Sequence, residues 1–287
     1  MVERARGTSG YALLGVLWIS AGVTALAATV AHSTREGIAV VRNRIALTEA
    51  QWSAEGCVAL AQSLIAERLQ DGARTHGLRH QHTWNRADAI TAGTFTSAGG
   101  HCDLEMHPVG SRADINTIEE SDLVHVMRAL GMSYQLADSI AKGIIAARPF
   151  FDHREITSLL GDDPYGVVEN ALTVEPGPVS LNHGSAPVLE MLPGFSKELV
   201  DVVIADRARG VLVQSFAELG AGLSPSARDT LAARSAQLPA TAVLDTDGWV
   251  ITARRTMKQP AVTAVVEIRI GRSGSGITVV RHRSWIS

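Results

Sequence analysis

The sequence predicts an α+β fold: a long N-terminal helix packed on a small antiparallel sheet, with a large all-α insertion of two helix-hairpin-helix-like repeats. Three observations predict it. An uncharged apolar segment near the N-terminus continues into an amphipathic one, strand-like segments lie on both sides of a long middle region, and that region contains an internal repeat. With 287 residues, of which 46% are hydrophobic, the chain can bury a substantial core.

The first predicted element is a membrane span. Residues Tyr11 to Ala31 contain no charged side chain, and at about 1.5 Å per residue such a helix is long enough to cross the apolar core of a bilayer. Arg4 and Arg6 lie just before it. Because positive residues mark the cytoplasmic side of a span, we expect the short N-terminus in the cytoplasm and the rest of the chain across the membrane.

A candidate cleavage junction, Gly10–Tyr11, precedes the apolar segment. An ordinary secretory signal has its small-residue cleavage site after the apolar core, so that the core is removed. Here a cut would release only the leader, residues 1–10, and the span would stay at the start of the mature chain. The alternative on these residues alone is an anchor that is never cleaved.

The helix is expected to continue beyond the span, with a transmembrane half at residues 11–31 and an amphipathic half at residues 32–72. No proline interrupts residues 36–68, and Asp71–Gly72 is typical of a helix end. Such a helix needs a sheet to cover its apolar stripe. The residues expected on that stripe are Ile38, Val41, Ile45, Thr48, Trp52, Cys57, Leu60, Ala61 and Leu64.

Strand-like segments flank the middle region. Residues 73–112 contain two of them, Thr94–Thr96 and Cys102–His107, on either side of a Gly99–Gly100 turn. Residues 239–287 contain three more, which are rich in β-branched residues and separated by turn residues. We therefore expect one sheet built from both flanks.

The inserted helical domain, residues 113–238, contains a repeat of roughly 60 residues. Each copy is expected to form a short helix, a tight glycine turn, a second helix and a third short helix. The matching segments, first copy before second, are Asp114–Thr117 and Ser180–His183, Ala129–Met132 and Leu192–Phe195, and Ile144–Arg148 and Val203–Arg207.

The repeats lack the features with which helix-hairpin-helix proteins bind DNA. In those proteins a glycine-hydrophobic-glycine turn presents its amides to phosphate. The two turns here are Gly131–Met132–Ser133 and Gly194–Phe195–Ser196, and the net charge from Arg112 to Glu175 is −6, which repels phosphate. We do not expect nucleic acid as a partner.

The sequence contains two cysteines, Cys57 and Cys102. Both are predicted on the side of the membrane where a disulfide persists. A bridge between them and two buried free thiols both fit the sequence, because spacing alone does not define their geometry.

No catalytic motif is present: the sequence has no nucleophile elbow, phosphate-binding loop or HExxH segment. His76, His80 and His82 are close enough in sequence to consider as metal ligands, but they fall in a predicted linker and are expected to be solvated. We therefore assign no catalytic residue and no metal site, and we expect the protein not to be an enzyme.

The chain resembles the minor pseudopilin K family of type II secretion systems, also called general secretion pathway protein K. The resemblance covers nearly the whole chain and depends on an ordered set of short segments. Gly15, at the fifth position after the junction, where major pilins carry glutamate, also fits this family. The matching segments are the Gly10 junction, Trp52–Gly56, Gly100–Asp103, Ala113–Asn116, Val179–Asn182, Ala186–Leu189, Leu192–Gly194 and Ser215–Leu219.

The resemblance implies a prepilin leader that prepilin peptidase cuts between Gly10 and Tyr11, with methylation of the new N-terminus. It implies a pilin-like fold anchored by one span in the bacterial inner membrane, with most of the chain in the periplasm. The implied function is that of a minor pseudopilin at the pseudopilus tip, which initiates or caps assembly and aids export of folded proteins across the outer membrane. The implied partners are the minor pseudopilins of the I and J type.

Members of this family can bind calcium near the first helical repeat, and this chain departs from the family pattern there. Oxygen ligands are present at Asp152, Glu155, Asp162 and Asp163, but their spacing matches no familiar calcium loop. We expect a solvated acidic loop and no cofactor, with calcium as the alternative.

Two other functions fit some of these features. The first is a minor pilin or competence-type component of a type IV pilus, with DNA contact through the helical repeats. The second is a single-span adaptor whose leader is never cut.

Overall fold

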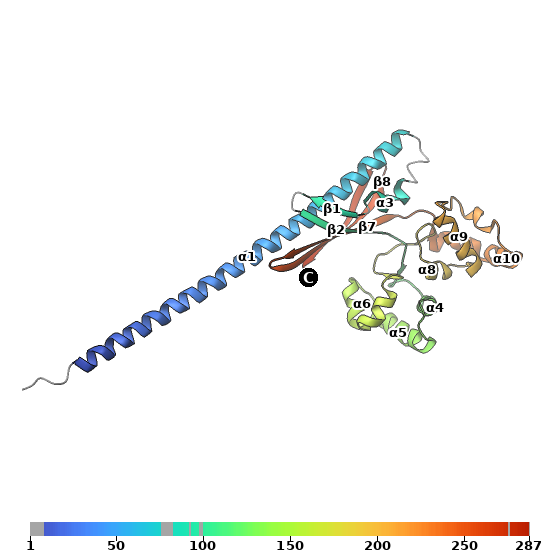
Figure 1. Cartoon of the computed structure of the whole chain (residues 1–287). Helices are drawn as coiled ribbons and strands as arrows, with labels where there is room; N and C mark the ends of the chain where they lie inside the picture. Colours follow the sequence, from blue (N-terminus) through green and yellow to red (C-terminus); the bar gives the residue numbers. More distant parts are fainter. Residues whose placement is uncertain (1–8, 76–82, 92, 98–99, 275, 287) are drawn as a thin grey trace, which may run out of the picture.

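The computed structural model describes residues 9–75, 83–91, 93–97, 100–274 and 276–286. A long helix, α1, lies across one face of a five-stranded antiparallel sheet, and the helical insertion lies beside the sheet, away from the free end of α1 (Figure 1). The predicted fold class, a long N-terminal helix on a small antiparallel sheet with a large helical insertion, is confirmed.

The sheet contains strands from both sides of the insertion. The insertion separates β2 from β7 in sequence, yet the two strands pair side by side, with Leu104 opposite Ala253. The prediction of one sheet built from both flanks is therefore confirmed. A short helix, α3 (Ala87–Thr91), precedes the first strand. In spatial order the strands are β1 (Gly93–Ser97), β2 (Gly100–Pro108), β7 (Gly248–Lys258), β8 (Ala261–Ser273) and β9 (Gly276–Ile286), and each neighbouring pair is antiparallel.

Helix α1 (Ser9–Thr75) continues slightly past the predicted end at Gly72. Its C-terminal part packs against the sheet and buries a face made mostly of small side chains. This face meets Trp249, Ile251, Val266 and Ile268 of the central strands in one apolar cluster. The buried residues of α1 are Ala46, Ala50, Ser53, Ala54, Cys57, Val58, Ala61, Ile65 and Leu69.

The predicted apolar stripe of α1 is wrong in part. Cys57 and Ala61 face the sheet as expected, but Ile45 is 60% exposed and Trp52 is 74% exposed. Alanine occupies the buried face because small side chains let the helix backbone lie close to the strands without leaving voids. Ile45 and Trp52 therefore lie on the opposite side, whereas Ile65 and Leu69, nearer the end of the helix, are buried.

The insertion consists of two closed repeats. In each one, a two-residue strand at the start pairs in parallel with a two-residue strand at the end. The buried apolar residues of both repeats form one cluster, separate from the cluster under α1. The first repeat contains β3 (Ala113–Asp114), α4 (Glu120–Ala129), α5 (Tyr134–Ala147), α6 (His153–Leu160), α7 (Asp162–Val168) and β4 (Leu172–Thr173). The second contains β5 (Val179–Ser180), α8 (Ala186–Glu190), α9 (Lys197–Ala208), η1 (Phe216–Gly220), α10 (Pro225–Arg234), η2 (Ser235–Gln237), α11 (Leu238–Thr241) and β6 (Ala242–Val243).

The glycine turns lie where the repeat predicts them. Gly131 and Gly194 have positive φ angles of 95° and 81°, a backbone conformation that favours glycine. The serines that replace the second glycine of the DNA-binding pattern cap the helices that follow. Ser133 Oγ accepts a hydrogen bond from Leu136 N at 3.4 Å, and Ser196 Oγ accepts one from Leu199 N at 3.3 Å. In this protein, backbone N–H groups at the start of these helices therefore donate to serine oxygens, whereas in DNA-binding repeats the N–H groups of the turn donate to phosphate.

One asparagine in each repeat holds the loop that follows the second helix. Asn116 Nδ2 donates to Phe150 O at 2.9 Å while its Oδ1 accepts from Phe150 N at 2.8 Å. Asn182 makes the same pair of bonds to Val213, at 3.1 and 2.8 Å. Each asparagine amide thus bonds both the backbone N–H and the backbone C=O of one loop residue, as a neighbouring β-strand would, and so fixes the loop.

We expect Asn182→Ala to lower the free energy of unfolding of the protein by about 2 kcal/mol, because the substitution leaves a backbone donor and acceptor of Val213 without partners. Asn182→Asp should also lower stability, because it places a buried carboxylate oxygen against the Val213 carbonyl oxygen in place of the amide donor. Asn43→Ala, on the exposed part of α1, is the control and should have no effect. Urea denaturation followed by circular dichroism measures all three. Equal stability of N182A and N43A would contradict the role assigned to Asn182.

Candidate assembly surface

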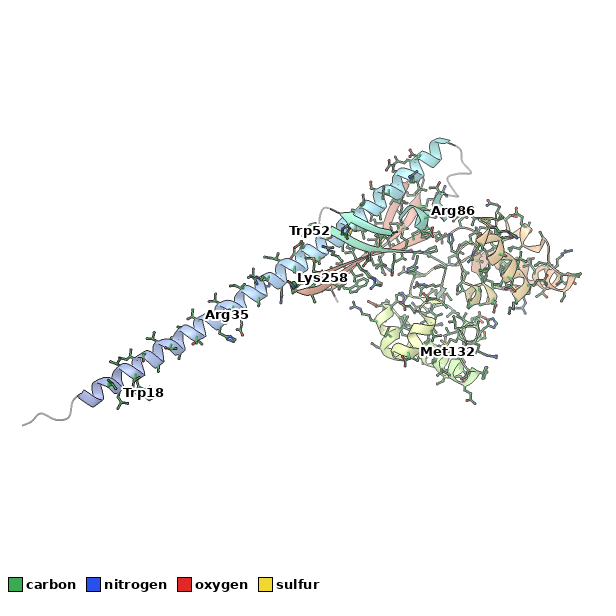
Figure 2. The ribbon with its side chains drawn as sticks, viewed as in Figure 1. Trp18, Arg35, Trp52, Arg86, Met132 and Lys258 are labelled. Carbon is green, nitrogen blue, oxygen red and sulfur yellow. A yellow bond between two sulfur atoms is a disulfide. The ribbon has the colours of Figure 1, made fainter. Side chains whose placement is uncertain are left out.

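Helix α1 divides into a free part and a packed part. Every side chain from Leu13 to Ile45 is exposed, and the first buried one is Ala46. The free part therefore leaves the body of the protein as an isolated rod (Figure 1). Figure 2 shows Trp18 on this rod and Trp52 where α1 passes the sheet.

The first half of α1 suits a bilayer. By length and composition it is the one helix in the described ranges that could cross a membrane. Hydroxyl side chains in it bond within the helix: Ser20 Oγ donates to Leu17 O at 2.9 Å, and Thr24 Oγ1 donates to Ser20 O at 2.8 Å. Such internal bonds reduce the cost of placing hydroxyl groups in hydrocarbon.

A second apolar stripe follows the first half along the outer side of α1. Ile38, Ile45 and Trp52 are seven residues apart, and Val41 lies one turn after Ile38, so the four fall on one side of the helix. Their exposed fractions are between 47% and 74%. We call Ile38, Val41, Ile45 and Trp52 the outer seam. A heptad-spaced apolar stripe that no described residue covers is the pattern with which one helix packs on another.

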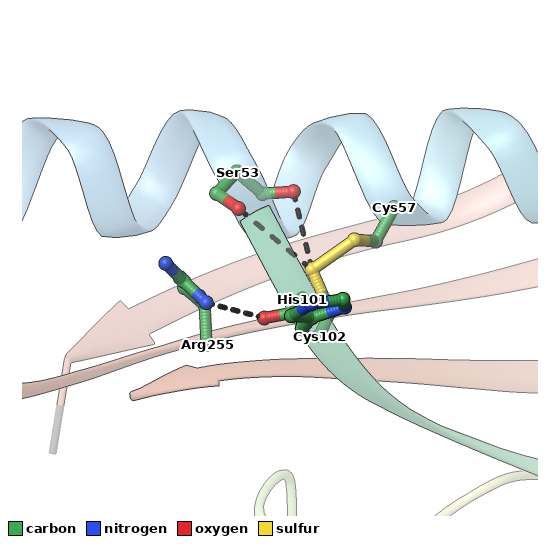
Figure 3. The surroundings of a disulfide bond; sticks show 5 residues. All are labelled: Ser53, Cys57, His101, Cys102 and Arg255. Carbon is green, nitrogen blue, oxygen red and sulfur yellow. Dashed lines mark hydrogen bonds between the residues drawn. A yellow bond between two sulfur atoms is a disulfide. The ribbon is translucent and has the colours of Figure 1, made fainter. Parts of the chain in front are cut away.

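A disulfide fixes the direction in which the outer seam faces. A disulfide joins Cys57 of α1 to Cys102 of β2, which is one of the two arrangements that fit the sequence (Figure 3). Ser53 Oγ lies 3.8 Å from Cys102 Sγ, one helical turn before Cys57. For cysteines 45 residues apart, the loss of entropy in the unfolded chain stabilises the fold by about 4 kcal/mol. The bond suits an oxidising compartment.

Polar contacts reinforce the position of α1 on the sheet. Glu55 Oε2 of α1 lies 3.0 Å from His282 Nε2 of β9. Below the disulfide, Arg255 Nη1 of β7 donates to His101 O at 2.6 Å, next to Cys102 (Figure 3). The disulfide to β2 and the Glu55–His282 contact to β9 thus hold α1 to strands on both sides of β7 and β8, and the Arg255–His101 bond joins β7 to β2 beside that disulfide.

The junction between the insertion and the sheet is polar. Residues 248–286 of the sheet carry a net charge of +6, whereas the first repeat carries −6. Arg281 Nη2 of β9 binds Glu175, which follows the first repeat, and lies 3.0 Å from Glu267 Oε1 of β8. Arg269 Nη1 lies 3.7 Å from Glu175 Oε2. Burial raises the pKa of Glu267 even though Arg281 opposes this shift.

Histidines line the same junction. His107 of β2 and His153 of α6 border a cavity of about 190 Å³ between the sheet and the first repeat. Burial, and then the nearby Arg112, lowers the pKa of each. His183 belongs to the second repeat: its Nε2 lies 2.9 Å from Asn85 O, and its ring meets Trp249 edge-on at 5.3 Å. Burial is also the main cause that lowers the pKa of His183.

Comparison with known proteins bears on this architecture. No protein-family model matches the chain, and no curated protein matches it. Among solved structures, a chain of the GspK–GspI–GspJ complex from the type 2 secretion system of enterotoxigenic Escherichia coli is similar, with a TM-score of 0.56 and 15% sequence identity. The similarity covers 86% of this chain and 99% of that one. The chain has a pseudopilin-like fold.

Within this pseudopilin-like fold, the junction predicted for processing lies at the start of α1. Gly10 and Tyr11 are in its first turn, and Gly15, one turn later, has no other atom within 4 Å of the position of a Cβ. The leader residues before Ser9 lie outside the described residues. Cleavage at Gly10 therefore stays a prediction.

The residues considered for metal binding are not brought together where the structure describes them. Asp152 caps α6 by accepting from Arg154 N at 2.9 Å, and Glu155 accepts from Phe151 N at 2.9 Å. In the described ranges, no three His, Cys, Asp or Glu side chains are placed to hold one ion. His76, His80 and His82 lie outside those ranges, as does the side chain of Asp162.

Sequence reasoning missed the outer seam and the polar junction. The heptad spacing of Ile38, Ile45 and Trp52 is visible in the sequence, but periodicity alone predicts these residues on the face that packs on the sheet. The charge contrast between the first repeat and the last three strands was also readable. It could have predicted their contact.

We expect the protein to lose stability as the pH falls below about 6.5, the ordinary pKa of histidine. Because His107, His153 and His183 have lowered pKa values in the folded state, that state binds fewer protons than the unfolded one. Their contribution is complete above the unfolded pKa and is lost as protons bind. Urea denaturation at pH 7.5 and at about pH 5.5 measures the difference.

The variant His183→Gln is the matched control, because it keeps a donor and an acceptor but does not titrate. Its stability should depend less steeply on pH over the same interval. The pKa of Glu267 is raised in the folded state, so protonation of Glu267 increases stability as the pH falls. Because glutamate titrates at lower pH than histidine, the measurements stay above about pH 5.5. Stability that is flat across the interval would contradict this account.

Proposed function

We propose that this chain is a minor pseudopilin of a type II secretion system, anchored in the inner membrane by α1 with its sheet and insertion in the periplasm. Prepilin peptidase would remove the leader at Gly10, and the mature chain would join the pseudopilins of the I and J type. The observation that carries this proposal is a pseudopilin-like fold whose α1 leaves the body without a partner and presents an apolar seam.

Assembly would begin in the membrane. Spans held in one bilayer are confined to a plane, which raises their effective concentration for each other. The free half of α1 would meet partner spans there, and the outer seam would continue the contact in water. A large residue such as Trp52, 74% exposed in the single chain, is well suited to become the buried centre of such an interface.

A place at the tip of the pseudopilus is supported by two features. Gly15 has no carboxylate, so this subunit lacks the group with which an incoming pilin-like subunit is thought to bind the N-terminal amine of the subunit above it. The insertion adds a second body beside the sheet (Figure 1). A subunit that needs no subunit above it, and that carries extra bulk, suits the end of a fibre. From there it would initiate or cap assembly and aid export of folded proteins across the outer membrane.

We expect Trp52→Asp to reduce co-purification with the I-type and J-type pseudopilins by at least about tenfold, because a charge at the centre of an apolar helix interface must be desolvated. Leu136→Asp is the matched control: it replaces another exposed apolar residue, 47% exposed, on α5 of the insertion. Co-expression, detergent extraction and affinity purification measure the recovered partners. Loss of the complex in L136D but not in W52D would defeat the seam model.

We expect the mature chain to begin at a methylated Tyr11. Gly10→Val should leave the leader attached, since the junction requires a small residue, whereas Gly22→Val, in open space within the same helix, should be processed normally. Mass spectrometry of the intact protein from cells that contain prepilin peptidase measures the N-terminus. An intact Met1 in the unmodified protein would rule out the pseudopilin assignment.

A further inference from the structure

The edge strand β9 is long and has one free side. In the described part of the sheet it pairs only with β8, from Ser273 opposite Gly276 to Ala264 opposite Ile286. It contains 11 residues, whereas β1 at the other edge contains 5. Alternate residues of an antiparallel edge strand direct their N–H and C=O groups away from the sheet, where a further strand can bind them.

The strand is already held in its extended form. Pairing with β8 fixes its backbone along its length. On one face, His282 lies 3.0 Å from Glu55 of α1, and on the other, the guanidinium of Arg154 lies 5.4 Å from the Trp285 ring centre. Binding of a partner would therefore not require β9 to become ordered, so the loss of conformational entropy that usually opposes association is smaller.

The charges of β9 select the partner. The strand contains Arg281, His282 and Arg283 and no acidic residue. Arg281 binds both Glu175 and Glu267, and Arg283 lies opposite Glu267 in the register, so with Arg269 three arginines share these two carboxylates. Two copies of β9 placed side by side would bring like charges together, which is unfavourable, whereas an acidic strand meets opposite charges.

The pattern of side chains adds a second requirement. Arg281, Arg283 and Trp285 lie on one face of β9, and His282, Ser284 and Ile286 alternate with them on the other. Val279 and Val280, at the bulge, are 48% and 60% exposed. A matching strand has acidic residues on the face of Arg281 and apolar ones on the other.

We propose that β9 is a docking site for an extended acidic segment of another polypeptide, which adds to the sheet as a sixth strand. Backbone hydrogen bonds along the free side of β9 supply affinity, and glutamate or aspartate beside Arg281 and Arg283 supplies selectivity. This surface is independent of the outer seam of α1. One subunit can therefore use both surfaces, one for fibre partners and one for an extended segment of a further protein.

The test uses the full chain in detergent micelles and a short capped peptide in which glutamate alternates with valine. Hydrogen exchange with mass spectrometry should show added protection in residues 276–286 and none in β1. Two N-methylated forms of the peptide, each blocked along one edge, separate strand addition from loose attraction. One form should bind at least tenfold more weakly than the parent, and the other should bind normally.

Two variants and one control peptide complete the test. Val280→Asp should weaken binding of the acidic peptide about tenfold, because it adds a negative charge beside the docking strand. Val280→Lys places a charge of opposite sign at the same exposed position and should not weaken binding. A peptide with lysine in place of glutamate should bind at least tenfold more weakly. Equal binding of both N-methylated forms, equal binding of the lysine peptide, or concentration-dependent dimerisation through β9 would each overturn the proposal. None of these outcomes involves α1, so the proposed role in the pseudopilus is tested separately.

Discussion

The packing of α1 on the sheet through a face of small side chains determines most of what this protein presents to its surroundings. Ala50, Ala54 and Ala61 are fully buried, so the helix lies close to the strands there, and Ile45 and Trp52 of the same helix face outward. A continuous α-helix rises about 1.5 Å per residue and has a fixed rotation per residue. The disulfide at Cys57 therefore sets both how far the free part extends and which way the outer seam faces.

The sheet accepts a large insertion because the two ends of that insertion leave from neighbouring strands. Pro108 at the end of β2 lies opposite Trp249 at the start of β7, so the chain departs and returns at one place. The insertion has its own apolar cluster, and each repeat is closed by its own parallel strand pair. It can therefore be added without disturbing the register of the sheet, which depends on pairs such as Leu104 with Ala253.

The sequence predicted what periodicity and turn chemistry specify. The strands after Thr241, the turns at Gly131 and Gly194 and the continuity of α1 all follow from local patterns. The sequence did not specify which face of α1 is buried. Periodicity gives large apolar residues such as Trp52 more weight than alanine, but the alanines face the sheet and Trp52 faces outward. The Cys57–Cys102 bridge and the paired bonds of Asn182 depend on distances between segments far apart in the chain, which no local pattern contains.

Two kinds of junction in this molecule have different physical consequences. Apolar packing and a covalent bond hold α1 to the sheet, and neither responds much to pH or salt. Ion pairs around Glu175 and the neutral ring of His183 help hold the insertion to the sheet, and both respond to pH, since partly buried charges are matched only while each group keeps its state. Changes of pH therefore act on the contacts between the insertion and the sheet more than on the packing of α1 against the sheet.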